Sequence, residues 1–100
     1  MTDPDTIEVV HNAPASRFEA HIPEGVCRAD YRRVGNALHM VHTETPHEAR
    51  GRGMAGLCVA AAVDYAEEQG LKVMPLCPYV RSWFRRHPER QNLLAPGARV

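Results

Sequence analysis

Apolar and polar residues alternate along the first half of the chain, and this alternation predicts β-strands. The alternating segments are residues 7–12, 16–22, 25–34 and 37–44. Links that favour tight turns join them, such as Ala13-Pro14-Ala15 and Gly35-Asn36. Four strands with such short connections form an antiparallel meander.

The periodicity then changes from two to between three and four, which indicates a helix over residues 52–69. Its apolar positions are Met54, Leu57, Cys58, Ala61, Ala62, Tyr65 and Ala66. Gly70 supplies a left-handed residue that ends the helix. A short apolar strand over 71–77 follows. A second helix then begins at Pro78 and stops before Pro88, because proline suits a first helical turn and not an interior.

The unit from 37 to 77 is strand, helix, strand, a crossover that places its two strands in parallel. We therefore predict an α/β (α+β) fold: a mixed, curved, mostly antiparallel sheet with a crossover helix and a C-terminal helix. Residues 1–6 are expected to form a flexible leader, 7–91 a single domain and 92–100 an irregular tail.

Composition places the chain among ordinary globular proteins of one domain. Of its 100 residues 44% are hydrophobic, and 12 basic residues balance 12 acidic ones. No net field therefore favours nucleic acid or an anionic membrane. No apolar run reaches membrane-spanning length, and no signal peptide is expected. Three widely spaced cysteines predict a reducing, cytoplasmic setting.

The charges are uneven, since five arginines follow Tyr79 against the single acid Glu89. These arginines form either a solvated helix face or an anion-binding surface. The six histidines predict no metal site. His39 and His42 are expected on opposite faces of one strand, and no histidine pair has the spacing of a zinc-binding helix.

The loop before the first helix carries two overlapping motifs. Residues 51–56 spell G-x-G-x-x-G, and residues 50–55 spell R-x-x-G-x-A. Glycines beside a helix N-terminus expose unpaired N–H groups to a phosphate, although they also suit a plain helix entry. A dinucleotide-binding turn is disfavoured, because Thr45 to Arg50 separate strand from glycine and the next strand ends in Cys77 rather than an acid. The Gly-Lys-Ser/Thr of a mononucleotide loop is also missing.

The second motif resembles the acetyl-coenzyme A motif of the GNAT acetyltransferase superfamily, in particular its short, single-domain YjdJ-type branch. The resemblance covers about residues 37–88 and is most specific in "HTETP", "RGRGMA" and "PLCPYV". It implies a fold of this kind and the following contacts to acetyl-coenzyme A. The backbone N–H groups of Gly51, Arg52, Gly53, Met54 and Ala55 hold the pyrophosphate, Thr45 lies along the pantetheine arm, and Arg50 or Arg52 meets the phosphates.

The implied reaction is acetyl transfer to an unidentified primary amine, either a small amine or a protein lysine. Larger members of the superfamily have additional helices and a further C-terminal strand pair around the acceptor, for which this chain has no room. An open acceptor site is therefore expected, in a monomer or weak homodimer.

Four residues are candidates for the chemistry. Cys77 ends a strand at a helix N-terminus, where a thiolate is stabilised, and the short branch has cysteine there. Three interpretations of Cys77 are open: a nucleophile that accepts the acetyl group, a base, or an inert buried thiol. His42 and Glu44 share one strand face and form either a base with its orienting partner or a cross-strand hydrogen bond. Tyr79 donates to the leaving sulfur or only packs.

Two other functions compete with acetyl transfer. The first is a coenzyme A-binding module with little or no transfer. The second is a thiol-based redox protein, which rests on Cys77 alone, because Cys58 is expected in the core and Cys27 within a strand.

Overall fold

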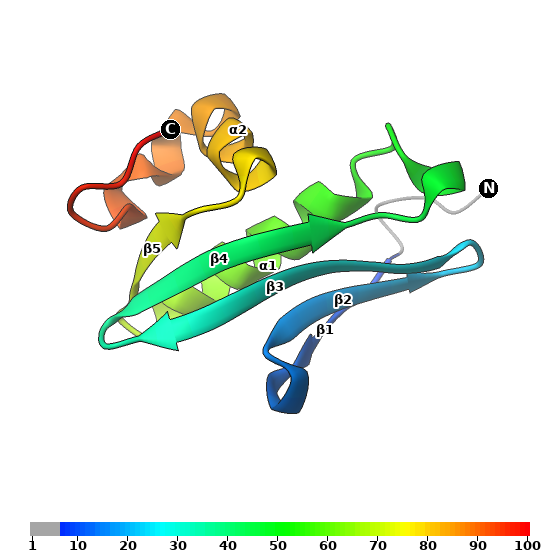
Figure 1. Ribbon diagram of the computed structural model, residues 1–100, viewed down its shortest axis with the longest axis horizontal. Helices are drawn as coiled ribbons and strands as arrows, with labels where there is room; N and C mark the ends of the chain where they lie inside the picture. The colour runs from blue at the N-terminus through cyan, green and yellow to red at the C-terminus, as the bar shows by residue number, and fades with distance from the viewer. Residues whose placement is uncertain (1–6) are drawn as a thin grey trace.

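The strands and helices follow one another in the order that the residue pattern predicts (Figure 1). The structure, a computed structural model, describes residues 7–100, so the leader expected at 1–6 lies outside the described residues. Strands are β1 (Val9–Asn12), β2 (Arg17–Ile22), β3 (Gly25–Val34), β4 (Ala37–Glu44) and β5 (Lys72–Pro75). The α-helices are α1 (Met54–Glu68) and α2 (Pro78–Arg86), and the short 3-10 helices are η2 (Ala13–Ala15), η3 (His47–Ala49) and η4 (Pro88–Leu93).

The strands form one sheet in the order β1-β2-β3-β4-β5. The first four pair antiparallel with their neighbours, as a meander requires. β5 pairs with β4 in parallel, which confirms the crossover through α1. The mixed, mostly antiparallel sheet predicted from the sequence is therefore present.

β4 and β5 separate halfway along β4. Their pairing ends at Met40 and Pro75, whereas β4 continues to Glu44. Beyond this point the backbone N–H groups of Leu76 and Cys77 both donate to the carbonyl of Met40. The chain then turns into α2, so on this edge the last residues of β4 have α2 and the start of α1 beside them instead of β5, while β3 still pairs with the other edge.

A bulge in β4 reverses the side-chain alternation. Asp30 pairs with His42 while Tyr31 pairs with Met40, so Val41 is an additional residue on β4. His39 pairs with Arg32, two residues from Asp30, and it therefore lies on the same face as His42. The expectation that these two histidines lie on opposite faces is wrong. The bulge also turns Thr43 toward the face that carries α1.

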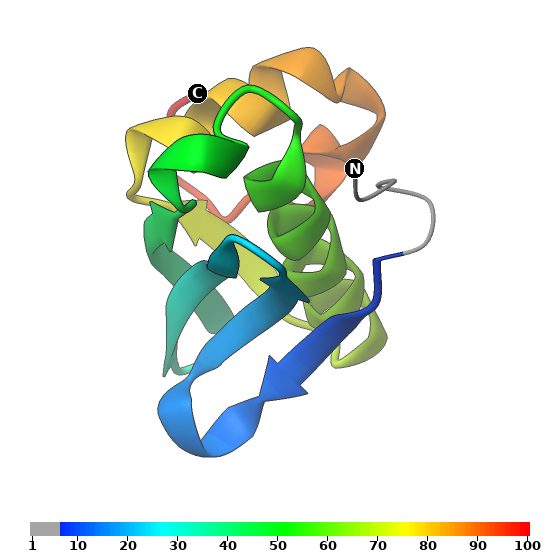
Figure 2. The ribbon, with the colours of Figure 1, turned by 90° about the vertical axis from the view of Figure 1, so that its right-hand side faces the viewer.

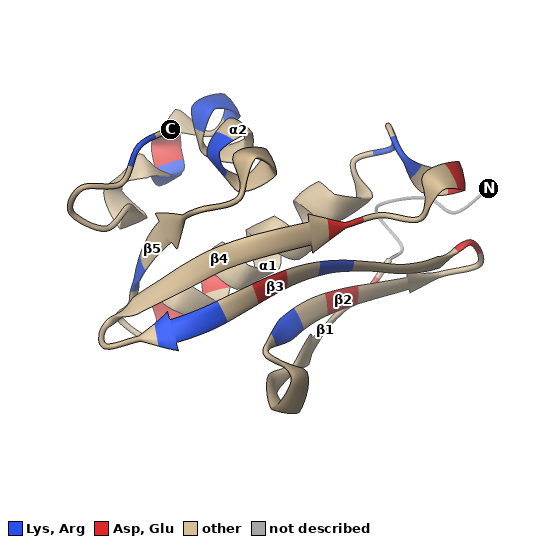
Figure 3. Ribbon diagram, viewed as in Figure 1, with Lys and Arg blue, Asp and Glu red and all other residues tan. Residues whose placement is uncertain are grey.

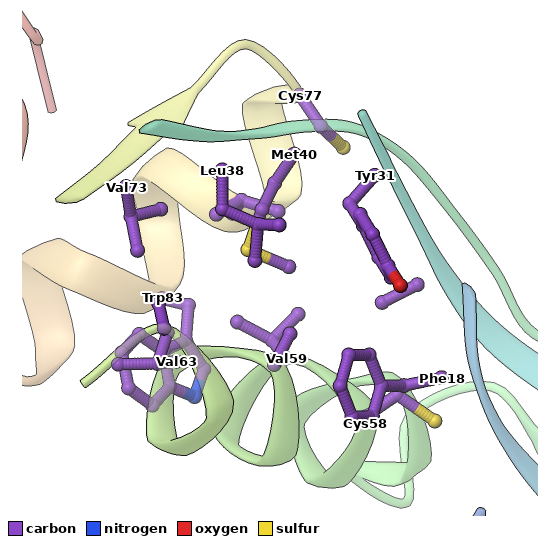
Figure 4. Close-up of a cluster of buried hydrophobic side chains, with 14 of the residues drawn as sticks. Phe18, Tyr31, Leu38, Met40, Cys58, Val59, Val63, Val73, Cys77 and Trp83 are labelled. Atoms are coloured by element: carbon purple, nitrogen blue, oxygen red, sulfur yellow. The ribbon is translucent and has the colours of Figure 1, made fainter. Parts of the chain in front are cut away.

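The core lies between the sheet and α1, which covers one sheet face (Figure 2). Side chains from both layers meet there, among them Leu38, Met40, Val59, Val63 and Val73 (Figure 4). The buried positions of α1 are Met54, Ala55, Cys58, Val59, Ala62, Val63 and Ala66. The predicted face is thus rotated slightly, because Leu57, Ala61 and Tyr65 are only partly buried.

The residues that follow α2 are anchored to the domain. Leu93 and Ala95 are buried. Leu94 forms an isolated parallel bridge with Val73, and the N–H of Ala95 donates to the carbonyl of Val73. This segment therefore covers part of the outer edge of β5.

The sheet face opposite α1 carries polar side chains that pair across strands. Glu19 of β2 is its most buried member, with 8% of its side chain exposed. Its carboxylate accepts hydrogen bonds from Asn12 at 3.1 Å, from His21 at 3.0 Å and from Arg17. These hydrogen bonds, with that from Asn12 the largest contribution, lower the pKa of Glu19 from its ordinary 4.5 to about 2.

Glu19 should therefore make folding sensitive to acid. A carboxyl with a lower pKa in the folded state contributes stability that is fully present above pH 4.5 and is lost as the pH falls toward 2. We expect a contribution on the order of 2 kcal/mol at pH 7. Urea unfolding of wild type and Glu19→Gln at pH 7, 4.5 and 2.5 measures it. The difference between the two proteins should shrink with acid, and a constant difference would contradict the assignment.

Candidate functional site

Two glycines shape the loop that leads from β4 into α1. Gly51 and Gly53 have φ of 86° and 77°, in the left-handed region that other residues avoid. An added Cβ at either position would meet no atom within 4 Å. Their backbone conformation therefore strongly favours glycine, and the space beside them is open to a ligand.

No side chain of the described residues caps the N-terminus of α1 with a hydrogen bond. Gly53 is the N-cap residue and offers no side chain, and the first turn contains no acidic residue. The first intrahelical bond at this end is donated by Leu57 to the carbonyl of Gly53. The preceding N–H groups of the turn are left for an external acceptor, with the partial positive charge of a helix N-terminus behind them.

A pocket of about 590 Å³ opens at this helix end. It is lined by Thr43, Glu44, Thr45, Ala49, Arg50, Gly51, Gly53, Met54, Ala55, Tyr79 and Arg86. Its walls are therefore the end of β4, the glycine loop with α1, and α2. The pocket brings together most of the residues that the sequence suggested for coenzyme A, namely Thr45, Arg50, Gly51, Gly53, Met54 and Ala55.

The two arginines of the loop have different surroundings. Arg50 lines the pocket, and no carboxylate of residues 7–100 forms an ion pair with it. Arg52 is directed away to Glu24 in the β2–β3 turn, where the two form an ion pair. That pair lowers the pKa of Glu24. Of the two, Arg50 is thus the one available to a phosphate in this conformation.

α2 supplies the opposite wall through Tyr79 and Arg86. A Cβ on Gly56 of α1 would lie 3.3 Å from the Tyr79 hydroxyl oxygen, so the absence of a side chain there lets the tyrosine approach α1. The guanidinium of Arg86 lies 5.8 Å from the centroid of the Tyr79 ring. Its Nη1 donates to the Ser82 hydroxyl at 2.7 Å. The third glycine of the motif therefore serves helix packing.

His42 and Glu44 form the predicted pair on one face of β4. The His42 Nε2 and a Glu44 carboxylate oxygen are 3.2 Å apart, and both side chains are about half exposed. Arg28 contacts the same carboxylate oxygen at 3.1 Å. The hydrogen bond from His42 and then the charge of Arg28 lower the pKa of Glu44. Glu44 lines the pocket whereas His42 does not, so the Glu44 carboxylate connects the pocket to the imidazole.

Cys77 lies beside Thr43 and does not itself line the pocket. It is the N-cap residue of α2 and is 8% exposed, so its thiol belongs largely to the core (Figure 4). Its sulfur lies 3.7 Å from the Thr43 hydroxyl, and Thr43 lines the pocket. Arg81 does not reach the thiol, because its guanidinium donates to the carbonyls of Pro75 and Leu76.

The other two cysteines are fully buried. Burial raises the pKa of Cys27, and it raises that of Cys58 to about 12. Both thiols are therefore protonated at neutral pH and have the structural character expected of them.

Thr43 and Arg86 are pocket residues that the sequence reasoning did not single out. Thr43 reaches the pocket only because of the bulge at Val41, which no periodicity indicates. The sequence did contain a signal for Arg86, namely the excess of arginines after Tyr79. One of the two interpretations of that excess was an anion-binding surface. Figure 3 shows basic segments both in the loop before α1 and on α2.

Within the part of the chain that the structure describes, no group of three metal-binding side chains is arranged around a common point. No helix in residues 7–100 has the length and apolar character needed to cross a bilayer.

Residues 17–93 match the family model described as GCN5-related N-acetyl-transferase. The chain is 31% identical over 96 residues to protein NATD1 of Xenopus tropicalis, covering 93% of this chain and 88% of that protein. It is 36% identical over 90 residues to protein NATD1 of Mus musculus, covering 87% and 82%. The fold is similar to that of a GCN5-like protein from Staphylococcus aureus solved by NMR, with a TM-score of 0.63, 22% identity and coverage of 88% and 87%.

The fold and the pocket at the start of α1 thus define a protein of the acetyltransferase type. The chain belongs to the GCN5-related N-acetyltransferase family. Within that family its full-length relatives include the NATD1 proteins of vertebrates, which are of similar size.

Proposed function

We propose that this protein binds acetyl-coenzyme A and transfers its acetyl group to a primary amine. The observation that carries the proposal is the uncapped N-terminus of α1, which opens with Gly51, Gly53 and Arg50 into a pocket of about 590 Å³. Backbone N–H groups, a helix dipole and an unpaired guanidinium together suit a pyrophosphate. Membership of the acetyltransferase family supports the same ligand.

The gap between the separated ends of β4 and β5 would accommodate the pantetheine arm of the ligand. Beyond Met40, β4 has no partner strand on its β5 side, although β3 still pairs with its other side, so the backbone groups of Thr43 and of Thr45 just after the strand remain free of β5. An extended pantetheine arm carries amide groups that can bond to such a strand, as an added strand does. The thioester would then lie between the end of β4 and the start of α2, near Thr43 and Tyr79.

Cys77 is the group that we assign to receive the acetyl group first. Its thiolate attacks the thioester carbonyl, the Cys77–acyl bond forms, and the bond to the coenzyme A sulfur breaks. The coenzyme A thiolate leaves and takes a proton from the Tyr79 hydroxyl, which regains it from water. The neutral amine then attacks the carbonyl of the acyl-cysteine, and the bond between that carbonyl and the Cys77 sulfur breaks, which releases the Cys77 thiolate. The proton that the amine nitrogen loses passes by way of the Glu44 carboxylate, which lines the pocket, to the His42 imidazole.

Intact-protein mass spectrometry tests the role of Cys77. With acetyl-coenzyme A and no acceptor, wild type should gain the mass of one acetyl group, and Cys77→Ala should gain none. Turnover with an amine should fall by about a hundredfold in Cys77→Ala. Cys27→Ala, a buried thiol away from the pocket, is the matched control and should keep both properties. Full turnover in Cys77→Ala would mean that the amine attacks the thioester directly.

The acetyl-transfer function itself is tested by release of free coenzyme A thiol from acetyl-coenzyme A in the presence of a panel of primary amines and lysine peptides. Steady turnover with at least one acceptor, lost in a variant that cannot bind coenzyme A, is the expected result. Binding without turnover over the whole panel would favour the second candidate function.

That second candidate is a coenzyme A-binding module with little or no transfer. The connection between β1 and β2 favours it, because it consists only of the short η2 helix, Ala13–Ala15. The space over the end of β4 is therefore not enclosed from that side, and Cys77 is largely buried. A binding module would bind acetyl-coenzyme A and free coenzyme A equally well and release no thiol.

A further inference from the structure

Arg86 is a second cation in the pocket, on the wall opposite the glycine loop. No carboxylate of the described chain forms an ion pair with it, although Arg17, Arg28, Arg52 and Arg90 all have such partners. Arg86 lies at the C-terminal end of α2 and points back over the ring of Tyr79. The pocket therefore contains an unpaired guanidinium that the phosphate cradle of α1 does not account for.

The position of Arg86 is fixed by its own helix. The Ser82 hydroxyl accepts a hydrogen bond from Nη1 at 2.7 Å, and the Tyr79 ring lies beneath the guanidinium. Tyr79 is in turn placed against Gly56 in the first turn of α1. A guanidinium that is held in this way needs little further ordering to bind an anion, and Arg86 lines the open pocket.

The two cationic features belong to different walls. The amides at the start of α1 and Arg50 form one wall. On the other wall, the Cα of Arg86 lies about two helical turns along α2 from Tyr79, a residue that approaches the first turn of α1. The two phosphate groups of a pyrophosphate share one bridging oxygen, so the glycine loop at the start of α1 can hold both of them. An additional cation on the facing wall suits a ligand with a phosphate group separate from its pyrophosphate.

We infer that Arg86 binds the 3′-phosphate of coenzyme A and is the residue that selects this cosubstrate over nucleotides and pantetheine derivatives without that group. The inference rests on the proposed function, since it names the part of the same ligand that α2 recognises. Bidentate guanidinium–phosphate contact provides the attraction. Glu44, the acidic residue of the pocket, is neutralised by Arg28 and does not oppose it.

Calorimetric titration with coenzyme A and with 3′-dephospho-coenzyme A tests this inference. Wild type should bind coenzyme A about tenfold more tightly, the preference that one exposed charge-assisted contact gives. Arg86→Gln should bind both ligands alike, with the affinity of wild type for the dephospho form. Arg85→Gln is the matched control, because Arg85 is an exposed neighbour on α2 that does not line the pocket, and it should keep the tenfold preference.

Three results would overturn the inference. In the first, Arg86→Gln weakens both ligands equally, which would place Arg86 on the pyrophosphate. In the second, wild type binds both ligands alike, which would leave the 3′-phosphate in solvent while the proposed function stands. In the third, wild type binds neither ligand, and the proposed function then fails together with this inference.

Discussion

Replacing Gly53 by aspartate should weaken acetyl-coenzyme A binding by more than about a hundredfold. The substitution places a carboxylate beside the unpaired N–H groups of α1, where it occupies the position of a phosphate and repels the remaining one. It also puts a side chain on a residue with φ of 77°, which costs about 1 kcal/mol for a residue other than glycine. Titration calorimetry on the folded variant measures the loss.

Gly53→Asn separates these two effects. Asparagine has nearly the same shape as aspartate and tolerates the left-handed region, but it carries no charge. We expect it to lose only about tenfold in affinity. Equal affinities for the aspartate and asparagine variants would show that no anion binds at this helix end, and the cradle would be only a helix entry.

Replacing Phe84 by alanine should remove a large part of the stability of the domain. Phe84 is fully buried, and its ring packs edge-to-face on Trp83 with centroids 5.1 Å apart. Truncating such a phenylalanine costs about 3–5 kcal/mol, in a class of protein that is stable by only about 5–15 kcal/mol. Chemical denaturation at neutral pH gives the change in the free energy of unfolding.

The exposed neighbour Arg85 is the control for this substitution. Arg85→Ala should change the free energy of unfolding by no more than about 0.5 kcal/mol. The Phe84 variant should also bind acetyl-coenzyme A less well, because α2 carries Tyr79 and Arg86 into the pocket. A loss of less than about 1 kcal/mol would mean that α2 is not packed as described.

The strands and their connections could be predicted because local chemistry determines them. The strands at 25–34 and 37–44 have the predicted bounds, since alternation and turn residues both indicate them. Gly70 adopts the left-handed conformation that ends α1. Cys77 is the N-cap residue of α2 and Pro78 its first residue, as the proline predicts.

Features that depend on pairing or packing could not be predicted in this way. α1 is apolar around most of its circumference, so periodicity alone could not identify Val59 and Val63 as buried positions. The bulge at Val41 is visible only once β3 and β4 are aligned. It moves His39 onto the face of His42 and brings Thr43 to the pocket, neither of which follows from the sequence of β4.

Only part of the candidate site could be predicted, because local chemistry determines some of its residues and packing determines the others. The glycines of the loop were recognisable, because a positive φ and an exposed helix N-terminus both favour glycine. The choice between Arg50 and Arg52 depends on Glu24, a residue of a distant hairpin. The contribution of Arg86 depends on the packing of α2 against α1, through Gly56 and Tyr79.

The most direct measurement is isothermal titration of the wild-type protein with acetyl-coenzyme A, with NAD and ATP as controls. We expect micromolar binding of acetyl-coenzyme A and no measurable heat with either nucleotide. Absence of binding to acetyl-coenzyme A would contradict the central proposal and reduce the glycine loop to the start of a helix. Equal binding of all three ligands would show a phosphate site without selectivity for coenzyme A.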